Sequence, residues 1–354
     1  MGKKAIIAMS GGVDSSVAAF IMKQKGYECI GATMKLYDNG DIQLSREKTC
    51  CSLDDIEDAR SVARRLDMSY YVFNFKDEFR EKVIDKFIRI YEEGGTPNPC
   101  IDCNRYLKFS KLFQRMRELD YDFVVTGHYA RVEEKDGWFY LKKGVDLSKD
   151  QSYVLYSLTQ EQLSHIKFPL GDYSKNEIRN IAENNGFINA HKKDSQDICF
   201  VPDGDYAKFI ESYTGKIYPQ GDFIDTKGNV LGRHNGIIRY TNGQRKGLGI
   251  ALGKPMYVSA KDTENNTVTL STNDELFSST LTADDFNWLV PDPERYTRCT
   301  ARVRYNMKEQ PAAFSINADG TVTVNFDAPQ RAITKSQAVV LYDGETVIGG
   351  GTIL

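Results

Sequence analysis

The chain has 354 residues, of which 41% are hydrophobic and 27% are charged, and its formal net charge at pH 7 is −3. This length exceeds what one ordinary core accommodates, so we expect two or three domains, and the composition excludes a disordered chain. The sequence contains no apolar run long enough for a membrane-spanning helix, so we expect a cytoplasmic protein that does not associate with membranes. The slight acidic excess does not indicate nucleic-acid binding, although it is compatible with a local basic face.

The first 200 residues alternate between short apolar runs, typical of strands, and amphipathic runs, typical of helices. The expected strands cover 4–10, 28–37, 70–75 and 122–127, and the expected helices cover 14–25, 52–66, 76–92, 105–119 and 174–185. Gly26 stands where the first helix should stop. Ser174 with Glu177 forms a capping box, and Ser52 with Asp55 forms a weaker one. Such alternation predicts an α/β domain over 1–205, with a doubly wound parallel sheet.

From about residue 206 the pattern changes to short alternating runs that are separated by Gly, Asp and Asn. These runs cover 254–262, 266–272, 321–327 and 338–354. They are typical of antiparallel strands joined by tight turns. We therefore expect a small central linker domain over 206–275, followed by a C-terminal β-barrel over 276–354.

The run "AMSGGVDSS" at 8–16 follows the first expected strand and opens the first expected helix. Gly11 and Gly12 allow the backbone to turn tightly and to approach a phosphate, which a helix N-terminus attracts. Asp14 could orient this loop or hold Mg²⁺, and the neighbouring serines add hydroxyl donors. No Walker motif is present, and a simple glycine turn is the alternative. The complete run resembles the pyrophosphate-binding loop (PP-loop) of the N-type ATP pyrophosphatases, which transfer AMP to a carbonyl oxygen and release pyrophosphate.

The seven cysteines, an odd number in a long chain, do not predict a disulfide scaffold. Cys100 and Cys103 form a C-x-x-C pair in "TPNPCIDCN", and Cys199 lies in "DSQDICFVPDGDY". The thiolate is the reactive form of cysteine. Three thiols beside an ATP-activating loop are suited to sulfur transfer, in which one thiol carries a sulfane sulfur and another resolves the persulfide.

Seven motifs together resemble the tRNA-specific 2-thiouridylases, bacterial enzymes that thiolate the wobble uridine of certain tRNAs. They are "AMSGGVDSS", "TPNPCIDCN", "VTGHYAR", "KDQSYVLYSL", "DSQDICFVPDGDY", "YTNGQRKGLGI" and "VRYN". The motifs occur in order and span nearly the whole chain. The resemblance implies a Rossmann-like PP-loop domain, a small central domain and a barrel that contacts tRNA.

The resemblance also implies a role for each matching position. It makes Cys103 the first catalytic cysteine and Cys199 the carrier of the persulfide. The implied ATP-binding residues are Ala8, Met9, Ser10, Gly11, Gly12, Val13, Asp14, Ser15, Met34 and Gly127. The implied tRNA-binding residues are Asn98 and Pro99 at the target base, with His128, Lys149, Asp150, Gln151, Arg304, Tyr305 and Gln337.

In the implied reaction, ATP adenylates the C2 oxygen of the uridine, and sulfur from the Cys199 persulfide then replaces that oxygen. Cys103 attacks the persulfide, either releasing hydrosulfide or forming a disulfide with Cys199. AMP and pyrophosphate leave, and Mg²⁺ screens the phosphate charges. A cysteine desulfurase or a sulfur-relay protein would supply the sulfur, and the tRNAs for Lys, Glu and Gln would accept it.

The sequence departs from the family at Cys100, where many relatives have an aspartate that is a proposed general base. Asp102 lies nearby, but the sequence does not show that it substitutes. The extra thiol opens an alternative in which Cys100, Cys103 and Cys199 hold a [4Fe–4S] cluster that binds hydrosulfide. A zinc site is less favoured because only three ligands are evident. More remote alternatives are an amide-forming ATP pyrophosphatase and a non-enzymatic RNA-binding module.

Several other residues have simpler interpretations. We expect Cys29 and Cys299 to be buried hydrophobic residues, and Cys50 and Cys51 to be packing residues near the site. The run "GQRKG" at 243–247 offers two adjacent cations between glycines. It could bind a phosphate or form an exposed turn, and we favour the phosphate.

Overall fold

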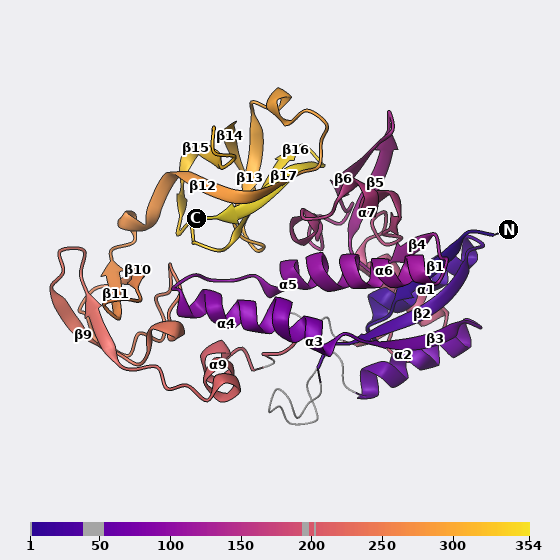
Figure 1. Cartoon of the computed structure of the whole chain (residues 1–354), viewed down its shortest axis with the longest axis horizontal. Helices are drawn as coiled ribbons and strands as arrows, with labels where there is room; N and C mark the ends of the chain where they lie inside the picture. The colour runs from indigo at the N-terminus through magenta and orange to yellow at the C-terminus, as the bar shows by residue number, and fades with distance from the viewer. Residues whose placement is uncertain (1, 38–52, 193–197, 202) are drawn as a thin grey trace.

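The computed structural model describes residues 2–37, 53–192, 198–201 and 203–354 (Figure 1). The described chain forms three sheets, and none of its helices combines the length and apolarity needed to cross a bilayer. The expectations for Cys50, Cys51 and the Ser52 cap fall outside these residues. We propose 1–205, 206–275 and 276–354 as the domain limits.

The first sheet is entirely parallel, with the strand order β3-β2-β1-β4-β7. Its strands are β1 (Lys4–Ala8), β2 (Glu28–Lys35), β3 (Ser69–Asn74), β4 (Phe123–Val125) and β7 (Ile166–Lys167). Ala5 and Ile7 point to one face, where α1, α2 and α8 pack, while Ile6 points to the other face, where α6 packs. Because both faces are covered there, the central strands β1 and β4 read as continuous apolar runs, whereas the edge strand β3 is largely exposed. The expected doubly wound parallel sheet is confirmed.

The helices on the first face are α1 (Val13–Gln24), α2 (Leu53–Arg65) and α8 (Lys175–Asn184). The predicted capping box of α8 is present, because the Ser174 and Glu177 side chains each bond to the other residue's backbone N–H. Gly26 has a φ of +80°, as expected of a residue that ends a helix.

Two long helical rods run between the first sheet and the central domain, below the barrel in Figure 1. The first consists of α3 (Lys76–Phe79), η1 (Arg80–Ile84) and α4 (Asp85–Glu92), and the second of α5 (Pro99–Asp102), η2 (Cys103–Lys111) and α6 (Leu112–Glu118). The η1 and η2 segments are π-helical. The second rod begins at Pro99 instead of near 105, because proline suits the first helical position and Asn98 caps it.

The central domain contains a four-stranded sheet with the order β10-β11-β8-β9. Its elements are α9 (Tyr206–Thr214), β8 (Gly221–Ile224), β9 (Val230–His234), η4 (Ile237–Arg239), β10 (Tyr257–Asp262) and β11 (Thr267–Ser271). Buried residues of this sheet share one hydrophobic cluster with the first helical rod. The central domain therefore packs directly against the first helical rod, and Cys103 and Leu107 of the second rod belong to the same cluster.

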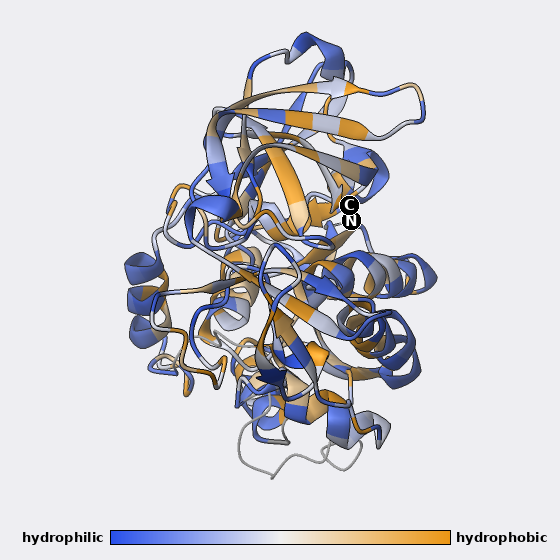
Figure 2. Ribbon diagram, turned by 90° about the vertical axis from the view of Figure 1, so that its left-hand side faces the viewer, coloured by the Kyte–Doolittle hydropathy of each residue, from blue (hydrophilic) through white to orange (hydrophobic). Residues whose placement is uncertain are grey.

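The C-terminal strands close into a barrel, because β12 pairs with both β15 and β17. The barrel region contains η5 (Asp274–Leu276), β12 (Phe277–Trp288), η6 (Pro293–Arg295), β13 (Cys299–Arg302), β14 (Gln310–Ile316), β15 (Val322–Arg331), β16 (Ala338–Asp343) and β17 (Thr346–Ile353). Figure 2 shows the barrel above the α/β domain, with hydrophobic segments along several of its strands.

One hairpin was not anticipated from the sequence. Its strands β5 (Ala130–Lys135) and β6 (Trp138–Lys143) belong to the N-terminal part of the chain but extend the barrel sheet through β17. η3 (Ser152–Leu155) and α7 (Gln160–Ser164) follow it. The absence of a Cβ at Gly350 of β17 leaves room for the Tyr156 ring, which such an atom would approach to 2.8 Å. The barrel is thus tied closely to the N-terminal part of the chain.

Candidate active site

The candidate residues gather where the parallel strands of the first sheet end. The loop at 8–15 follows β1, Met34 is near the end of β2, and Gly127 follows β4. In open α/β sheets, ligands bind at the carboxyl ends of the strands. The predicted ATP-binding residues therefore lie at the edge where the fold favours a nucleotide.

The loop at 8–15 has a backbone shape that requires glycine. Gly11 has a φ of +74°, and a Cβ atom there would lie 2.4 Å from the carbonyl oxygen of Asp55. The Ser15 Oγ donates to the Gly12 carbonyl at 3.0 Å and accepts from the Ser10 N–H at 3.2 Å. These bonds hold the turn in the shape that directs the start of α1 toward the sheet edge.

Asp14 is held by neighbouring side chains. The Lys175 Nζ donates to its two carboxylate oxygens at 2.8 and 2.9 Å, and the Tyr129 hydroxyl donates to it at 2.7 Å. Gly127 packs so closely that an added Cβ would lie 2.8 Å from the Asp14 carbonyl carbon. Of the two expected roles of Asp14, these contacts favour orienting the loop over binding Mg²⁺.

Two further residues support the loop from behind and were missed by sequence reasoning. The Asn189 Nδ2 donates to the Gly11 carbonyl at 2.9 Å. The Lys192 Nζ contacts the Asp55 carboxylate at 2.6 Å and the same Gly11 carbonyl at 3.4 Å. Neither residue stands in a recognised motif, so only the fold brings them to the loop.

The cysteine loop begins the second helical rod. Asn98 caps α5 by accepting the Cys100 N–H at 3.2 Å, which leaves Cys100 exposed. Cys103 is only 9% exposed and is the first residue of the π-helical η2. Such π-helical segments occur frequently at functional sites. Burial raises the pKa of the Cys103 thiol to about 11, so the thiol is protonated at neutral pH.

Cys199 packs against the same hydrophobic cluster that contains Cys103. Its carbonyl oxygen accepts a hydrogen bond from the Tyr37 hydroxyl at 2.9 Å, and Tyr37 follows β2. Met34, a predicted ATP-binding residue, also packs against this cluster. The structure therefore brings the two predicted catalytic cysteines, distant in sequence, to one cluster beside the nucleotide edge.

The three predicted cysteines do not form a metal site. Cys100, Cys103 and Cys199 all belong to the described residues, and within that part of the chain no group of three His, Cys, Asp or Glu side chains is arranged to hold a metal ion. The donor set does not fit a [4Fe–4S] cluster or a zinc ion in this arrangement. We therefore derive no step through either group.

The Asp102 side chain, two residues after Cys100, is held by the first helical rod. Its carboxylate is buried and accepts a hydrogen bond from the Lys86 Nζ at 2.7 Å. Burial raises the pKa of Asp102, and Lys86 opposes this effect. Further along the rod, Arg105 forms a two-point ion pair with Asp285 of β12, which ties the Cys103 helix to the barrel.

The predicted tRNA contacts near the target base come together from two parts of the chain. The Gln337 side chain donates to the Thr96 carbonyl at 2.7 Å and to the Pro97 carbonyl at 3.4 Å, just before Asn98. Burial raises the pKa of the Tyr305 phenol, and the nearby Cys100 adds to this rise. The barrel thus meets the cysteine loop at the position where the resemblance places the target base.

Two other residues predicted to contact tRNA, Asp150 and His128, are buried inside the protein. The Asp150 carboxylate is buried and accepts hydrogen bonds from the Gly144 and Ser152 N–H groups at 3.2 and 3.1 Å. Gln151 accepts from a backbone N–H, while Lys149 is half-buried. The buried His128 ring lies 2.6 Å from the Thr126 hydroxyl, and burial lowers the pKa of His128 well below its usual value. In this arrangement, Asp150 and His128 support the loops around them.

His234 and the remaining cysteines in the described part of the chain fit structural roles. His234 is fully buried, and its ring bonds to the backbone of Gly236 and Asn266. Cys29 is buried in β2, where burial raises the pKa of its thiol to about 11. Cys299, which was expected to be buried, is only partly buried and contacts a carbonyl oxygen within the barrel. The expectation that Cys29 is a buried hydrophobic residue is confirmed.

Family models match nearly the whole chain. A model described as the tRNA methyl transferase HUP domain matches residues 3–203, a tRNA methyl transferase PRC-barrel domain matches 207–272, and an aminomethyltransferase beta-barrel domain matches 278–353. In contrast, the solved U34-tRNA thiolase NcsA from Methanococcus maripaludis with its [4Fe-4S] cluster is a distant match. It is 18% identical over 60% of this chain and 68% of its own, with a TM-score of 0.35, and a likeness at this level does not bear on function.

The similarity to curated relatives is much closer. The tRNA-specific 2-thiouridylase MnmA of Clostridioides difficile (strain 630) is 50% identical, covering 100% of this chain and 98% of the relative. The tRNA-specific 2-thiouridylase MnmA 1 of Thermoanaerobacter sp. (strain X514) is 52% identical, covering 99% and 97%. Three family models match in order along the chain, and curated relatives are about half identical to it over its full length. This chain therefore belongs to the family of tRNA-specific 2-thiouridylases.

Proposed function

We propose that this chain catalyses the ATP-dependent 2-thiolation of the wobble uridine of tRNA. The observation that carries the proposal is the packing of Cys103 and Cys199 on one cluster, beside the sheet edge that holds the PP-loop. An adenylating site and a sulfur carrier are both needed for this reaction, and this shared packing supports the proposal that they act together. The names of the curated relatives support the same activity.

In the first step, the C2 oxygen of the uridine attacks the α-phosphorus of ATP. An O–P bond forms, the bond to the β-phosphate oxygen breaks, and pyrophosphate leaves while the uridine N3 loses its proton. The loop at 8–15 would hold the departing diphosphate on its backbone N–H groups and on the positive end of α1. Asp14, fixed by Lys175 and Tyr129, keeps the start of α1 in place.

In the second step, the terminal sulfur of a Cys199 persulfide attacks C2, which the adenylate has made electrophilic. The Cys103 thiolate then attacks the Sγ of Cys199, so the persulfide S–S bond breaks and a Cys103–Cys199 disulfide forms. The sulfur left on C2 becomes the thiocarbonyl as the C2–O bond breaks and AMP departs, and N3 takes up a proton to complete the 2-thiouridine. A thiol reductant must reduce the disulfide before the next turnover. We assign the sulfur supply to a cysteine desulfurase or sulfur-relay protein, and the acceptors to the tRNAs for Lys, Glu and Gln.

Because Cys103 is buried, its thiol is not ready to attack the persulfide in the ligand-free protein. A thiol with a pKa of about 11 contains little thiolate at neutral pH, and thiolate is the attacking species. The thiol is also only 9% exposed, so we propose that the cysteine loop shifts when tRNA and ATP bind and exposes Cys103 only when the adenylate is present. This order protects the persulfide from premature attack.

The decisive experiment separates adenylation from sulfur transfer. Pyrophosphate release and 2-thiouridine formation are measured with ATP, unmodified tRNA and a persulfide donor for the wild-type chain, Cys199→Ser and the control Cys299→Ser. We expect Cys199→Ser to retain tRNA-stimulated pyrophosphate release but to form no 2-thiouridine, while Cys299→Ser retains both. Full thiolation by Cys199→Ser would exclude the persulfide role. Absence of tRNA-stimulated pyrophosphate release by the wild-type chain would refute the whole proposal.

A further inference from the structure

Two adjacent cations in the central domain have no counter-ion among the residues that the structure describes. Arg245 and Lys246 are exposed, and neither side chain has an ion pair or a hydrogen bond within the described part of the chain. The nearby Arg239, in contrast, is neutralised by both carboxylate oxygens of Glu211 at 2.6 Å. In a chain with a net charge of −3, an uncompensated pair of cations indicates a surface suited to anions.

The turn that presents these cations is held rigidly. The Gln244 side chain accepts the Thr241 N–H at 2.9 Å and donates to the Lys246 carbonyl at 3.1 Å. The Gln244 N–H also donates to the Thr241 carbonyl at 2.9 Å. A backbone fixed in this way lowers the entropic cost of holding a ligand.

Arg245 and Lys246 line a cavity of about 1180 Å³, and Arg304 of the barrel forms part of its wall. The Arg304 Nη2 donates to the Asn242 and Ala332 carbonyls at 3.1 Å, while its buried Nε has no partner. On the side of α9 the cavity is lined by Asp203 and Asp205, whose carboxylates accept backbone N–H groups at the start of that helix. The cavity is therefore basic on the central-domain and barrel sides.

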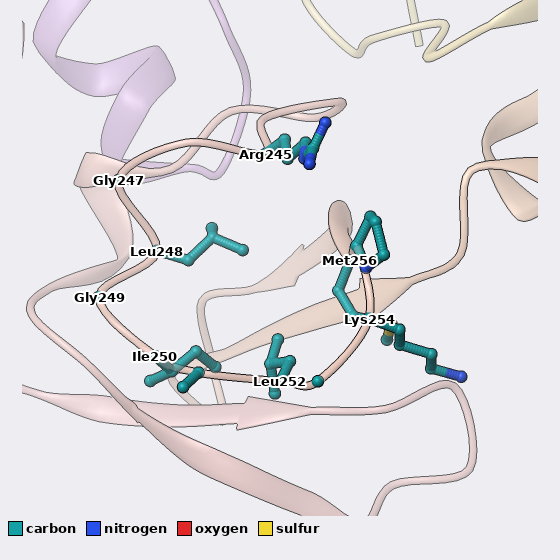
Figure 3. A pocket seen from close by; sticks show the side chains of 11 residues that line it. Arg245, Gly247, Leu248, Gly249, Ile250, Leu252, Lys254 and Met256 are labelled. Atoms are coloured by element: carbon teal, nitrogen blue, oxygen red, sulfur yellow. The ribbon is translucent and has the colours of Figure 1, made fainter.

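A second cavity of about 580 Å³ adjoins the first, since both are lined by Arg245 and Gly247. Figure 3 shows Arg245 on one side of its opening and Lys254 on another, with Leu248, Ile250, Leu252 and Met256 between them. The glycines in this loop carry no side chain that could block a bulky ligand. Together, the two cavities form a continuous surface along the loop at 241–256, which we call the basic loop.

We infer that the basic loop binds the sugar–phosphate backbone of the tRNA beyond the wobble nucleotide. Arg304 precedes Tyr305, which lies near Cys100 at the position proposed for the target base. A strand leaving that position along the wall formed by Arg304 would reach Arg245 and Lys246. Contacts between these cations and phosphates carry no information about the base, so they would position the RNA and would not select its sequence. The inference rests on the proposed function, because it names a further part of the same substrate's binding surface.

The test is the salt dependence of tRNA binding. The Kd for unmodified tRNA is measured between 50 and 200 mM salt for the wild-type chain, Arg245→Ala/Lys246→Ala and the control Lys25→Ala/Arg64→Ala. The slope of log K against log salt is negative, and each lost phosphate contact reduces its magnitude by about 0.9. The magnitude for the double variant should therefore be smaller than that of the wild type by about 1.8. When the salt concentration rises fourfold, the factor by which the tRNA affinity of the double variant falls should be about ten times smaller than the factor for the wild type. The variant Arg245→Lys/Lys246→Arg keeps both charges and should keep the wild-type slope.

The control cations are exposed near the ends of α1 and α2, away from the basic loop, and their removal should leave the slope unchanged. A wild-type slope in Arg245→Ala/Lys246→Ala, in a chain that binds and thiolates tRNA, would overturn the inference but not the proposed function. A wild-type chain that does not bind tRNA would overturn both. A double variant with the wild-type slope that fails only with a protein persulfide donor, and works with a small-molecule persulfide, would assign the surface to an acidic protein partner. That result would also overturn the inference.

Discussion

The reactivity of Cys103 in the ligand-free protein provides a quantitative prediction. Its thiol is 9% exposed, and burial raises its pKa from 9.0 to about 11. At pH 8 a thiol with a pKa of 9.0 is about one-tenth thiolate, whereas Cys103 should be about one-thousandth thiolate. Alkylation by iodoacetamide should therefore be about a hundredfold slower at Cys103 than at an ordinary thiol, before any further steric protection.

Alkylation is followed at each cysteine by mass spectrometry between pH 7 and 10, with the urea-denatured chain as the reference for an ordinary thiol. The rate at Cys103 should still be rising at pH 10 in the folded chain and should increase at pH 8 when ATP and unmodified tRNA are added. Equal rates at Cys103 in the folded and denatured chains at pH 8 would refute the buried, protonated state. No increase with ATP and tRNA would refute the proposed exposure during the reaction.

Three further predictions concern the loop, the barrel contact and the Cys199 loop. Gly11→Ala should weaken ATP binding and destabilise the fold by about 1–2 kcal/mol or more, because Gly11 has a φ of +74° and the new Cβ would meet Asp55. Calorimetry measures the ATP affinity and thermal unfolding measures the stability. An unchanged affinity and stability would contradict the loop geometry. The Arg105 guanidinium lowers the pKa of Asp285. The ion pair therefore stabilises the fold fully at pH values above the ordinary carboxyl pKa, and this stabilisation is lost as the pH falls through the lowered pKa of Asp285. Asp285→Asn should therefore flatten the acid limb of the stability profile measured by urea unfolding, and an identical limb would exclude the contribution. Tyr37→Phe should cost about 1 kcal/mol of stability and slow single-turnover sulfur transfer, and an unchanged transfer rate would show that the hydrogen bond to the Cys199 carbonyl does not position the persulfide.

The sequence predicted the fold class well because the local signals agreed with the tertiary structure. The apolar strand runs, the stop at Gly26 and the capping box at Ser174 and Glu177 are all local features, and each is confirmed. The expected start of the second rod near residue 105 was wrong. The rod begins at Pro99, because proline suits the first helical position and "TPNPC" had been interpreted as a loop. The hairpin β5–β6 was missed because its place in the barrel sheet depends on pairing with a strand about 200 residues away.

The candidate site was predictable only where motifs mark it. The glycines of the phosphate loop and the three cysteines stand in motifs, so their residue types could be named in advance. The supporting contacts of Asn189 and Lys192 could not, because their geometry depends on long-range packing. Burial of Cys103 was also unpredictable, since the surrounding cluster draws on the first helical rod, the central domain and the Cys199 loop.

The most direct test of the account is to map the disulfide that one turnover leaves behind. The wild-type chain, loaded with persulfide, is given ATP and unmodified tRNA without a reductant, quenched with acid and digested for mass spectrometry. We predict a Cys103–Cys199 disulfide in proportion to the 2-thiouridine formed, and none when ATP is omitted. Accumulation of 2-thiouridine with both thiols still reduced would contradict the account.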